Sequence, residues 1–144
     1  MSDFILIDGD KAKFLKSSFL PADIAVRDGQ LTASGKGNLE GKAVCIEGDE
    51  ATVIVQGCAY STPSFSTVKG VGLLKIKALG SDQVATKTNS LDTPILLKGS
   101  LFDAEFKVIV PAQQLVGTAL QPDSQLTYDG KGQFETSNNK WTAT

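Results

Sequence analysis

The sequence contains no histidine among its 144 residues. Serine–histidine and cysteine–histidine nucleophile pairs, histidine general bases and histidine metal ligands are therefore all excluded. The two cysteines alone cannot fill the four ligand positions of a structural zinc site. The composition thus predicts no metal, no cofactor and no catalytic residue, and it argues against an enzyme.

Long apolar runs and an excess of positive charge are also missing. The longest runs, FILI at 4–7 and VIV at 108–110, are far shorter than the ~20 residues that a membrane-spanning helix needs. The formal net charge is -2, whereas a protein that binds nucleic acid normally presents a basic face. The N-terminal MSDFILIDGD lacks the basic start of a secretory signal. We therefore expect a protein made in the cytoplasm without a cleaved export signal, with no nucleic-acid partner and no stable membrane insertion.

Cys45 and Cys58 are the two residues that could form a thiol pair. In the cytoplasm cysteines are normally free thiols. A disulfide also needs the two Cα atoms within about 7 Å of each other, which simple strand pairing does not arrange here. We predict two free thiols, with a disulfide as the alternative if the protein acts outside the cell.

The pattern of hydrophobic residues predicts an all-β protein. The length and the hydrophobic fraction of 41% are typical of one folded domain, here taken as residues 1–144. Strand-like stretches lie at 71–79, 93–98 and 104–110, and in the last of these the odd and even positions should face opposite sides. Residues 10–20 are the one helix candidate, although KAKFL within them also fits a strand.

Turn signals predict a series of β-hairpins. Asp-Gly pairs, which accept the positive φ of tight turns, occur at 8–9, 28–29 and 129–130. They predict an N-terminal hairpin of FILI with KAKF and a C-terminal hairpin before KWTA. A further hairpin is predicted over 42–55. The Ser/Thr-rich stretch 58–67 is predicted as a loop, and 111–124 as a connecting arm before the C-terminal hairpin.

A Gly-x-Gly motif occurs three times, as GKGNLE at 35–40, GVGLLK at 70–75 and GKGQFE at 130–135. Neither the phosphate-loop pattern nor the dinucleotide pattern fits these stretches. The unequal spacings exclude a strict solenoid but allow three hairpins around a rough threefold axis. Because glycine permits close backbone approach, these turns are predicted to contact a partner. The predicted partner-binding residues are Gly35, Gly37, Gly70, Gly72, Gly130 and Gly132.

The stretch TASGKGNLEGKAVCIEGD, 32–49, resembles the repeat of PAAR-type spike-tip proteins. That repeat has a Ser-Gly opening, a strand, a Gly-Lys turn, a second strand and a closing Gly-Asp. Segments 66–83 and 127–141 look like degenerate copies of it. The matching pairs are Ser34-Gly35, Gly41-Lys42 and Gly48-Asp49, while Ala43 and Cys45-Ile46 stand where the family has proline and Ala-Arg.

The resemblance implies a small β-pyramid, barrel or prism with rough threefold repetition. PAAR-type proteins sit on the trimeric spike, VgrG-like or phage-spike-like, of contractile machines such as type VI secretion systems and phage-tail-like particles. Their base docks on the spike and their apex meets the target membrane. The resemblance therefore implies a non-enzymatic tip or adaptor that helps puncture membranes or attaches an effector and leaves the cell with the particle. The zinc site of that family needs histidines, which this chain lacks.

Other functions also have to be weighed on the sequence. A β-sandwich or barrel binding module, for example for carbohydrate, would make the glycine motifs coincidental. Asp103 and Glu105 would share one face of a strand, as paired catalytic carboxylates can, but an exposed edge strand explains this spacing as well. An oligonucleotide-binding barrel is disfavoured because the charges are balanced and no basic stripe is present.

Overall fold

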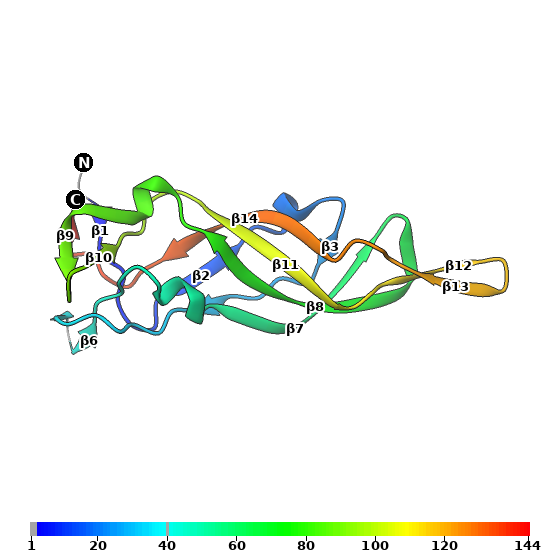
Figure 1. Ribbon diagram of the computed structural model, residues 1–144, viewed down its shortest axis with the longest axis horizontal. Coiled ribbons are helices and arrows are strands. Elements are labelled where there is room, and N and C mark those ends of the chain that lie inside the picture. The colour runs from blue at the N-terminus through cyan, green and yellow to red at the C-terminus, as the bar shows by residue number, and fades with distance from the viewer. Residues whose placement is uncertain (1–2, 40) are drawn as a thin grey trace.

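The computed structural model describes residues 3–39 and 41–144. The chain is drawn out along one axis, with the described ends of the chain at one end of the molecule and the β12–β13 hairpin at the other (Figure 1). Short 3₁₀ turns are η1 (Lys16–Phe19), η2 (Asp49–Thr52) and η3 (Ser81–Gln83). The strands are β1 (Asp3–Phe4), β2 (Lys11–Phe14), β3 (Asp23–Ile24), β4 (Gly29–Gln30), β5 (Asn38–Leu39), β6 (Lys42–Ala43), β7 (Ile54–Thr62), β8 (Phe65–Ala78), β9 (Val84–Ser90), β10 (Thr93–Leu96), β11 (Phe102–Val110), β12 (Gln113–Val116), β13 (Ala119–Pro122), β14 (Thr127–Glu135) and β15 (Thr142–Ala143).

One antiparallel sheet runs along most of the molecule. Its strand order is β13-β12-β8-β11-β14-β2-β4, and β7 pairs with both β8 and β3. The long strands β8, β11 and β14 cross the middle of the molecule (Figure 1). The prediction of an all-β protein is confirmed.

Aromatic rings fill the main core on the inner face of this sheet. The Phe102 ring lies edge-on to Phe14, with centroids 5.7 Å apart, and 4.9 Å from Phe134. Tyr60 meets Phe106 edge-on at 5.1 Å. Such offset and edge-on pairs are favoured over stacked sandwiches because they bring ring edges to ring faces. All five rings are buried.

The predicted strands at 71–79, 93–98 and 104–110 lie in β8, β10 and β11, so these predictions are confirmed. Phe106 and Val108 face the core as expected. Val110 is 56% exposed, because the pairing of β11 with β8 shifts register between Val108 and Val110. Alternation along a strand cannot predict such a bulge.

Three predicted hairpins are wrong because their strands pair with distant segments. FILI does not pair with β2; instead β1 pairs with β15, and β2 pairs with β14 and β4. Within 42–55, β6 pairs with β5, while β7 pairs with β8 and β3. The C-terminal β14 pairs with β11 and β2 rather than with β15. Hydrophobic pattern and turn residues locate strands but do not choose between local and remote partners.

Other local predictions also change. Residues 58–67 are not a loop but the hairpin of β7 and β8, with Pro63 and Ser64 between the strands. Residues 10–20 hold β2 and then η1, which confirms the strand alternative for KAKF. Residues 111–124 do connect β11 to β14, but they form the β12–β13 hairpin. Of the Asp-Gly pairs, only Gly9 has a positive φ; Gly29 and Gly130 lie within strands.

Candidate functional site

The end of the molecule opposite the β12–β13 hairpin is built from three two-stranded antiparallel ribbons, counted over residues 3–39 and 41–144: β15–β1, β5–β6 and β9–β10. Their paired positions correspond: Phe4 faces Thr142, Ala43 faces Asn38, and Pro94 faces Asn89. One strand of each ribbon continues into a short segment, and these segments are 4–8, 43–47 and 94–98. We call the three ribbons with these segments the three-ribbon end.

Backbone hydrogen bonds join the three segments into a closed ring. The N–H of Leu6 donates to the carbonyl of Leu96 at 3.0 Å, that of Leu96 donates to Cys45 at 3.0 Å, and that of Cys45 donates to Leu6 at 2.9 Å. Each segment therefore donates to one neighbour and accepts from the other at the same position. The ring has a threefold pattern of bonds made by one chain.

A second cycle of bonds joins the same segments in the opposite sense, with donors two residues after and acceptors two residues before those of the first cycle. Asp8 N–H donates to Ala43, Glu47 N–H donates to Pro94, and Lys98 N–H donates to Phe4, at 2.8 to 2.9 Å. The isolated bridges Ile7–Val44, Ile46–Ile95 and Ile5–Leu97 join the three segments pairwise at equivalent positions. The three segments therefore correspond in their bridge pairs and in their hydrogen-bond donors and acceptors.

The side chains of the ring point alternately to two sides. Leu6, Cys45 and Leu96, at the centres of the segments, are fully buried and belong to the main core. Most of the residues beside them belong to a second apolar cluster, and Ile46 packs against it half-buried. The buried members of that cluster are Ile5, Val44, Ala85, Ile95, Leu97 and Ala143. The ring therefore separates the core from the interior of the three-ribbon end.

A glycine with a positive φ directly follows each segment. The φ angles are 86° at Gly9, 106° at Gly48 and 56° at Gly99, a region that glycine adopts without steric cost. The buried carboxylates of Asp10 and Asp49 then accept the N–H of Ile7 and of Ile46 at 2.8 and 2.9 Å. At the third position stands Ser100, whose N–H and hydroxyl both donate to Asp82.

The sequence signal of the threefold repeat is ILIDGD at 5–10, VCIEGD at 44–49 and ILLKGS at 95–100. The Gly-x-Gly reading missed it and assigned the further copies to 66–83 and 127–141. Only the copy that closes at Gly48-Asp49 was located correctly. Aligning the apolar triplets together with the glycine that follows two residues later would have found all three.

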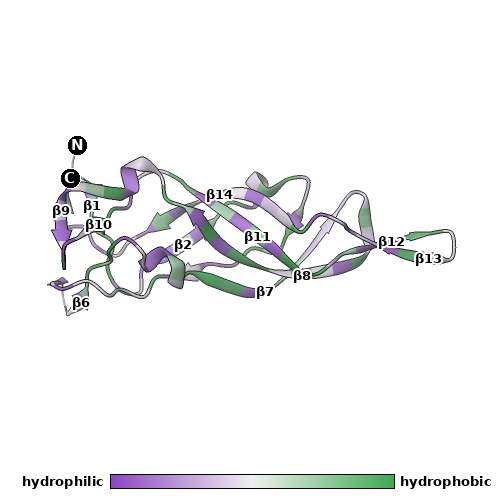
Figure 2. Cartoon of the chain, viewed as in Figure 1, coloured by the Kyte–Doolittle hydropathy of each residue, from purple (hydrophilic) through white to green (hydrophobic). Residues whose placement is uncertain are grey.

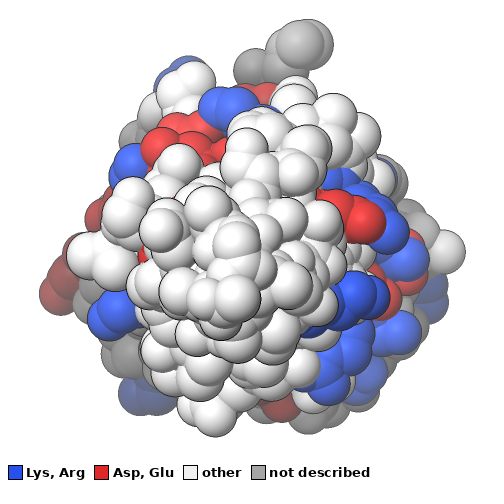
Figure 3. Space-filling view, turned by 90° about the vertical axis from the view of Figure 1, so that its right-hand side faces the viewer, with Lys and Arg blue, Asp and Glu red and all other residues white. Residues whose placement is uncertain are grey.

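The opposite end of the molecule is the hairpin of β12 and β13 with its Gly117-Thr118 turn, which we call the finger. Viewed end-on, this end is a cap of uncharged residues with Lys, Arg, Asp and Glu around its margin (Figure 3). No charged residue occurs from Val108 to Pro122 or from Cys58 to Val68, the β7–β8 hairpin beside it.

A buried polar network holds the root of the finger. The hydroxyls of Tyr60 and Tyr128 both donate to Oδ2 of Asp123, at 3.0 and 2.5 Å. The Tyr60 hydroxyl also accepts the N–H of Ala112 at 3.0 Å, and Asp123 N–H donates to the Ala112 carbonyl at 2.8 Å. Ala112 and Asp123, which flank the finger, are thus tied to each other and to the core.

Burial raises the pKa of both tyrosines at this root. For Tyr128, burial is the largest cause, and the hydrogen bond to Asp123 raises the pKa further. For Tyr60, burial and Asp123 also raise the pKa, against the opposing hydrogen bond from Ala112. Both hydroxyls therefore stay protonated and donate to the carboxylate at neutral pH.

The fold is thus elongated, with a threefold end and an uncharged tip. The family of contractile injection system spike tip proteins matches residues 1–144, the whole chain. The chain belongs to this spike-tip family. The resemblance seen at 32–49 is confirmed, with a structural role as an injection-system tip. No curated protein matches the sequence.

The six glycines predicted as a partner surface do not gather on one face of this spike tip. Gly70 and Gly72 lie within β8, and Gly130 and Gly132 within β14, all four buried. Gly35 and Gly37 lie at the three-ribbon end, where Gly35 N–H donates to Val44 and Gly37 accepts the N–H of Val44. Glu40, the last residue of that motif, lies outside the described residues.

The strand glycines make room for aromatic rings. A Cβ at Gly72 would lie 2.4 Å from the Phe106 ring, and one at Gly132 would lie 2.3 Å from Phe102. A Cβ at Gly130 would meet the Phe19 ring at 2.6 Å. Their burial leaves these glycines inside the spike tip, where they serve core packing.

Both cysteines are free thiols buried in the main core. Cys45 occupies the centre of one ring segment, and burial followed by the nearby charge of Asp49 raises its pKa well above its ordinary value. The Sγ of Cys58 lies 3.9 Å from Arg27 Nη2. Because reactivity requires access, neither buried thiol is placed to act as an exposed nucleophile.

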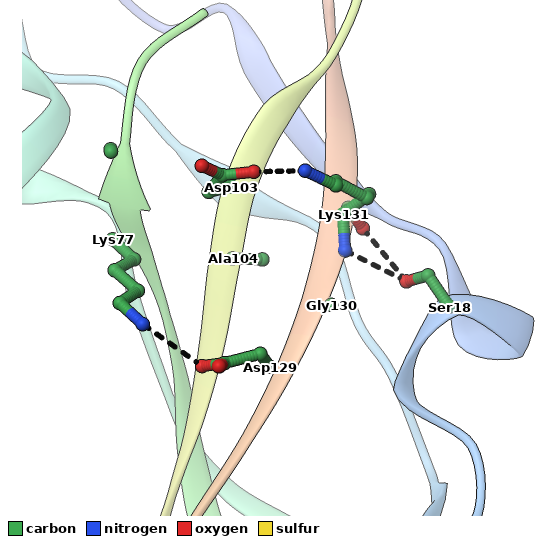
Figure 4. Close-up of a pocket in the computed structure, with 8 residues that line it drawn as sticks. Ser18, Lys77, Asp103, Ala104, Asp129, Gly130 and Lys131 are labelled. Carbon is green, nitrogen blue, oxygen red and sulfur yellow. Dashed lines mark hydrogen bonds and ion pairs between the residues drawn. The ribbon is translucent and has the colours of Figure 1, made fainter.

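A groove of about 330 Å³ crosses the outer face of β8, β11 and β14 beside η1 (Figure 4). Its charged side chains neutralise one another: Lys77 pairs with Asp129 at 3.3 Å, and Lys131 pairs with Asp103. Glu105, which lies on β11 as Asp103 does, pairs with Lys75 of β8 at 3.6 Å. Since β11 lies between β8 and β14, the edge-strand explanation of these carboxylates is wrong; cross-strand ion pairing explains them.

Residues 3–39 and 41–144 contain no group of three His, Cys, Asp or Glu side chains that could hold a metal ion. Within the same residues, no helix is long and apolar enough to cross a membrane. The expectations that the protein binds no metal and no cofactor stay predictions.

Proposed function

We propose that this chain is a non-enzymatic cap on the trimeric spike of a contractile injection machine, of the type VI or phage-tail-like kind, and that it docks through its three-ribbon end. The closed ring of hydrogen bonds among Leu6, Cys45 and Leu96 is the observation that carries the proposal. Membership of the spike-tip family supplies the setting.

Symmetry explains why such an end suits a spike. A trimeric spike ends in three identical surfaces around one axis, and a single cap on that axis must offer three similar surfaces in return. The ribbons β15–β1, β5–β6 and β9–β10 supply them, one to each spike subunit. One chain then satisfies three contacts without forming a trimer itself.

The packing of the three-ribbon end and its exposed residues support contact with the spike. The second apolar cluster fills the space between the ribbons, so they form a packed support rather than separate arms. Asn38, Asn89 and Thr142 occupy equivalent positions of the ribbons, and all three are exposed. They mark three corresponding surface points for contact.

This orientation directs the finger away from the spike, because the finger lies at the far end of the long axis (Figure 1). The particle would carry the tip out of the cell, which requires no export signal on the chain. In this arrangement the finger end is the part that first meets a target or carries an attached effector.

The test places a bulky side chain on each ribbon in turn. Asn38→Trp, Asn89→Trp and Thr142→Trp should each weaken binding to the purified spike trimer of the same injection system, measured by biolayer interferometry. Gln121→Trp, at an exposed finger position, is the matched control and should bind normally. Loss of binding in the control with normal binding of all three ribbon variants would show that the finger end docks instead.

A further inference from the structure

The finger carries apolar side chains on both of its faces. Neighbouring residues of a strand point to opposite sides, yet Leu115 and Val116 are both apolar, with 49% and 53% exposure. Across the hairpin Leu115 pairs with Leu120, and Val116 pairs with Ala119. Hydrophobic residues continue to the far end of the molecule (Figure 2). A surface that docks into a protein groove usually needs only one apolar face, whereas this hairpin suits surroundings that are apolar on every side.

The backbone of the finger has few unpaired donors. Val116 and Ala119 flank a two-residue turn and form a hydrogen-bonded pair, so Leu120 turns its N–H outward and the next outward position is Pro122. Proline has no N–H to leave unpaired. On the other edge, Leu115 N–H donates to the hydroxyl of Thr67 at 3.0 Å.

The outward backbone groups of β12 and β13 determine which kind of partner the finger can contact. Unpaired backbone groups make entry into the hydrocarbon core costly. Leu115 N–H is paired and Pro122 has no N–H, whereas the outward Leu120 N–H and the outward carbonyls would stay in the hydrated interfacial layer. Proline on an outer edge also opposes the addition of a strand from another protein. The finger is therefore better suited to lipid than to β-augmentation.

The size and attachment of the finger set how far it can reach. Four strand residues extend about 13 Å, less than half of the ~30 Å hydrocarbon core. The finger cannot span a bilayer, and the charged margin seen in Figure 3 would remain in water. The Tyr60–Asp123–Tyr128 network fixes its root, so the hairpin projects as a preformed element.

We propose that the finger enters the interfacial layer of one leaflet of a lipid bilayer, with Leu115, Val116 and Leu120 as its lipid-contacting residues. The inference rests on the proposed function in one respect: docking through the three-ribbon end leaves the finger free to reach a membrane. Because the finger is uncharged, binding should depend on apolar contact and not on anionic headgroups.

The experiment uses the isolated full-length chain and an environment-sensitive fluorophore on Thr118→Cys. The native thiols are buried and should not react under native conditions. Vesicles of phosphatidylcholine alone, and of phosphatidylcholine with phosphatidylglycerol, should shift the emission to the blue to the same extent, at low and high salt. The same label on Asn89→Cys, at the three-ribbon end, should not shift.

A double variant, Leu115→Ser with Leu120→Ser, should have an affinity for vesicles lower by about tenfold or more. The reason is that it removes two half-exposed leucines from the contact. Leu101→Ser is the matched control, because Leu101 is 43% exposed on another part of the chain. It should bind vesicles as the unsubstituted chain does.

Several results would overturn the inference: no shift at Thr118→Cys, equal shifts at both labels, or binding only to anionic vesicles at low salt. Self-association of the unsubstituted chain that the double variant loses would assign the finger to a second copy. The double variant should still bind the spike trimer normally. A failure of spike docking by the unsubstituted chain would reject the proposed function. The vesicle experiment tests the lipid contact of the finger independently of that result.

Discussion

The N–H of Cys45 donates to the carbonyl of Leu6 at 2.9 Å, and this bond is one side of a triangle. Leu96 supplies the other two sides, donating to Cys45 and accepting from Leu6. A single chain therefore presents a threefold end without three copies of itself. This relationship connects the repeat in the sequence to the trimeric partner that we propose.

The ring should be a stability centre as well as a docking support. Leu96→Ala should lower the free energy of unfolding by roughly 2–5 kcal/mol, because it leaves a cavity at a fully buried position. Leu101→Ala removes the same atoms from an exposed position and should change stability little. Urea unfolding of both variants measures the difference, and equal effects would contradict a packed ring.

The strand glycines should be intolerant of even a methyl group. Gly132→Ala should cost roughly 1–3 kcal/mol, since its Cβ would lie 2.3 Å from the Phe102 ring. Combining it with Phe102→Leu should recover part of that loss, which a double-mutant cycle would report as a coupling energy. Additive effects of the two substitutions would mean that the ring is not the obstacle.

The sequence alone predicts the all-β class because strands such as β11 alternate apolar and polar residues over several positions. It does not predict the ring, since the triplets at 5–7, 44–46 and 95–97 are continuously apolar and each pairs with remote segments. Alternation reports burial on one side of a sheet, whereas these residues are buried on both sides.

The glycine motifs predict turns, because glycine permits unusual backbone angles and close backbone approach. In β8 and β14 the reason for glycine is an aromatic ring that arrives from another part of the chain. Phe106 and Phe102, which require Gly72 and Gly132, lie on β11 between those strands. A single sequence holds no signal for such a contact until the pairing of the strands is known.

Asp123 should be needed for the root of the finger. Asp123→Ala leaves the buried hydroxyls of Tyr60 and Tyr128 without their acceptor, at a cost of about 1–3 kcal/mol for each group left unpaired. Limited proteolysis should then cut within 113–122 faster than in the unsubstituted chain. Asp123→Asn keeps one acceptor oxygen and should lose less; an Ala variant as stable as the original would refute the network.

Stability should fall at alkaline pH. Burial, strengthened at Tyr128 by Asp123, raises the pKa of Tyr60 and Tyr128 in the folded state above the ordinary value of about 10. Buried Cys45 behaves likewise above its ordinary value of 9.0. The unfolded chain therefore loses these protons first, so the stabilisation is complete below about pH 9 and declines as the pH rises beyond it.

The urea midpoint should accordingly stay level near neutral pH and drop above about pH 9 to 10. Tyr128→Phe removes one of the responsible groups and should make the decline shallower, whatever it does to stability at neutral pH. A titration of tyrosinate absorbance in the native protein should place both transitions above about pH 10. A rise of stability with alkaline pH would contradict the assigned direction of the shifts.

The most direct test of the threefold end is the stoichiometry of its complex with the spike. Native mass spectrometry of the chain mixed with the purified spike trimer should show one copy bound to each trimer at saturation, even with the chain in excess. Three copies for each trimer would mean that every spike subunit binds its own tip and that the pseudo-threefold ring is not a docking device. The absence of any complex at micromolar concentrations would equally contradict the account.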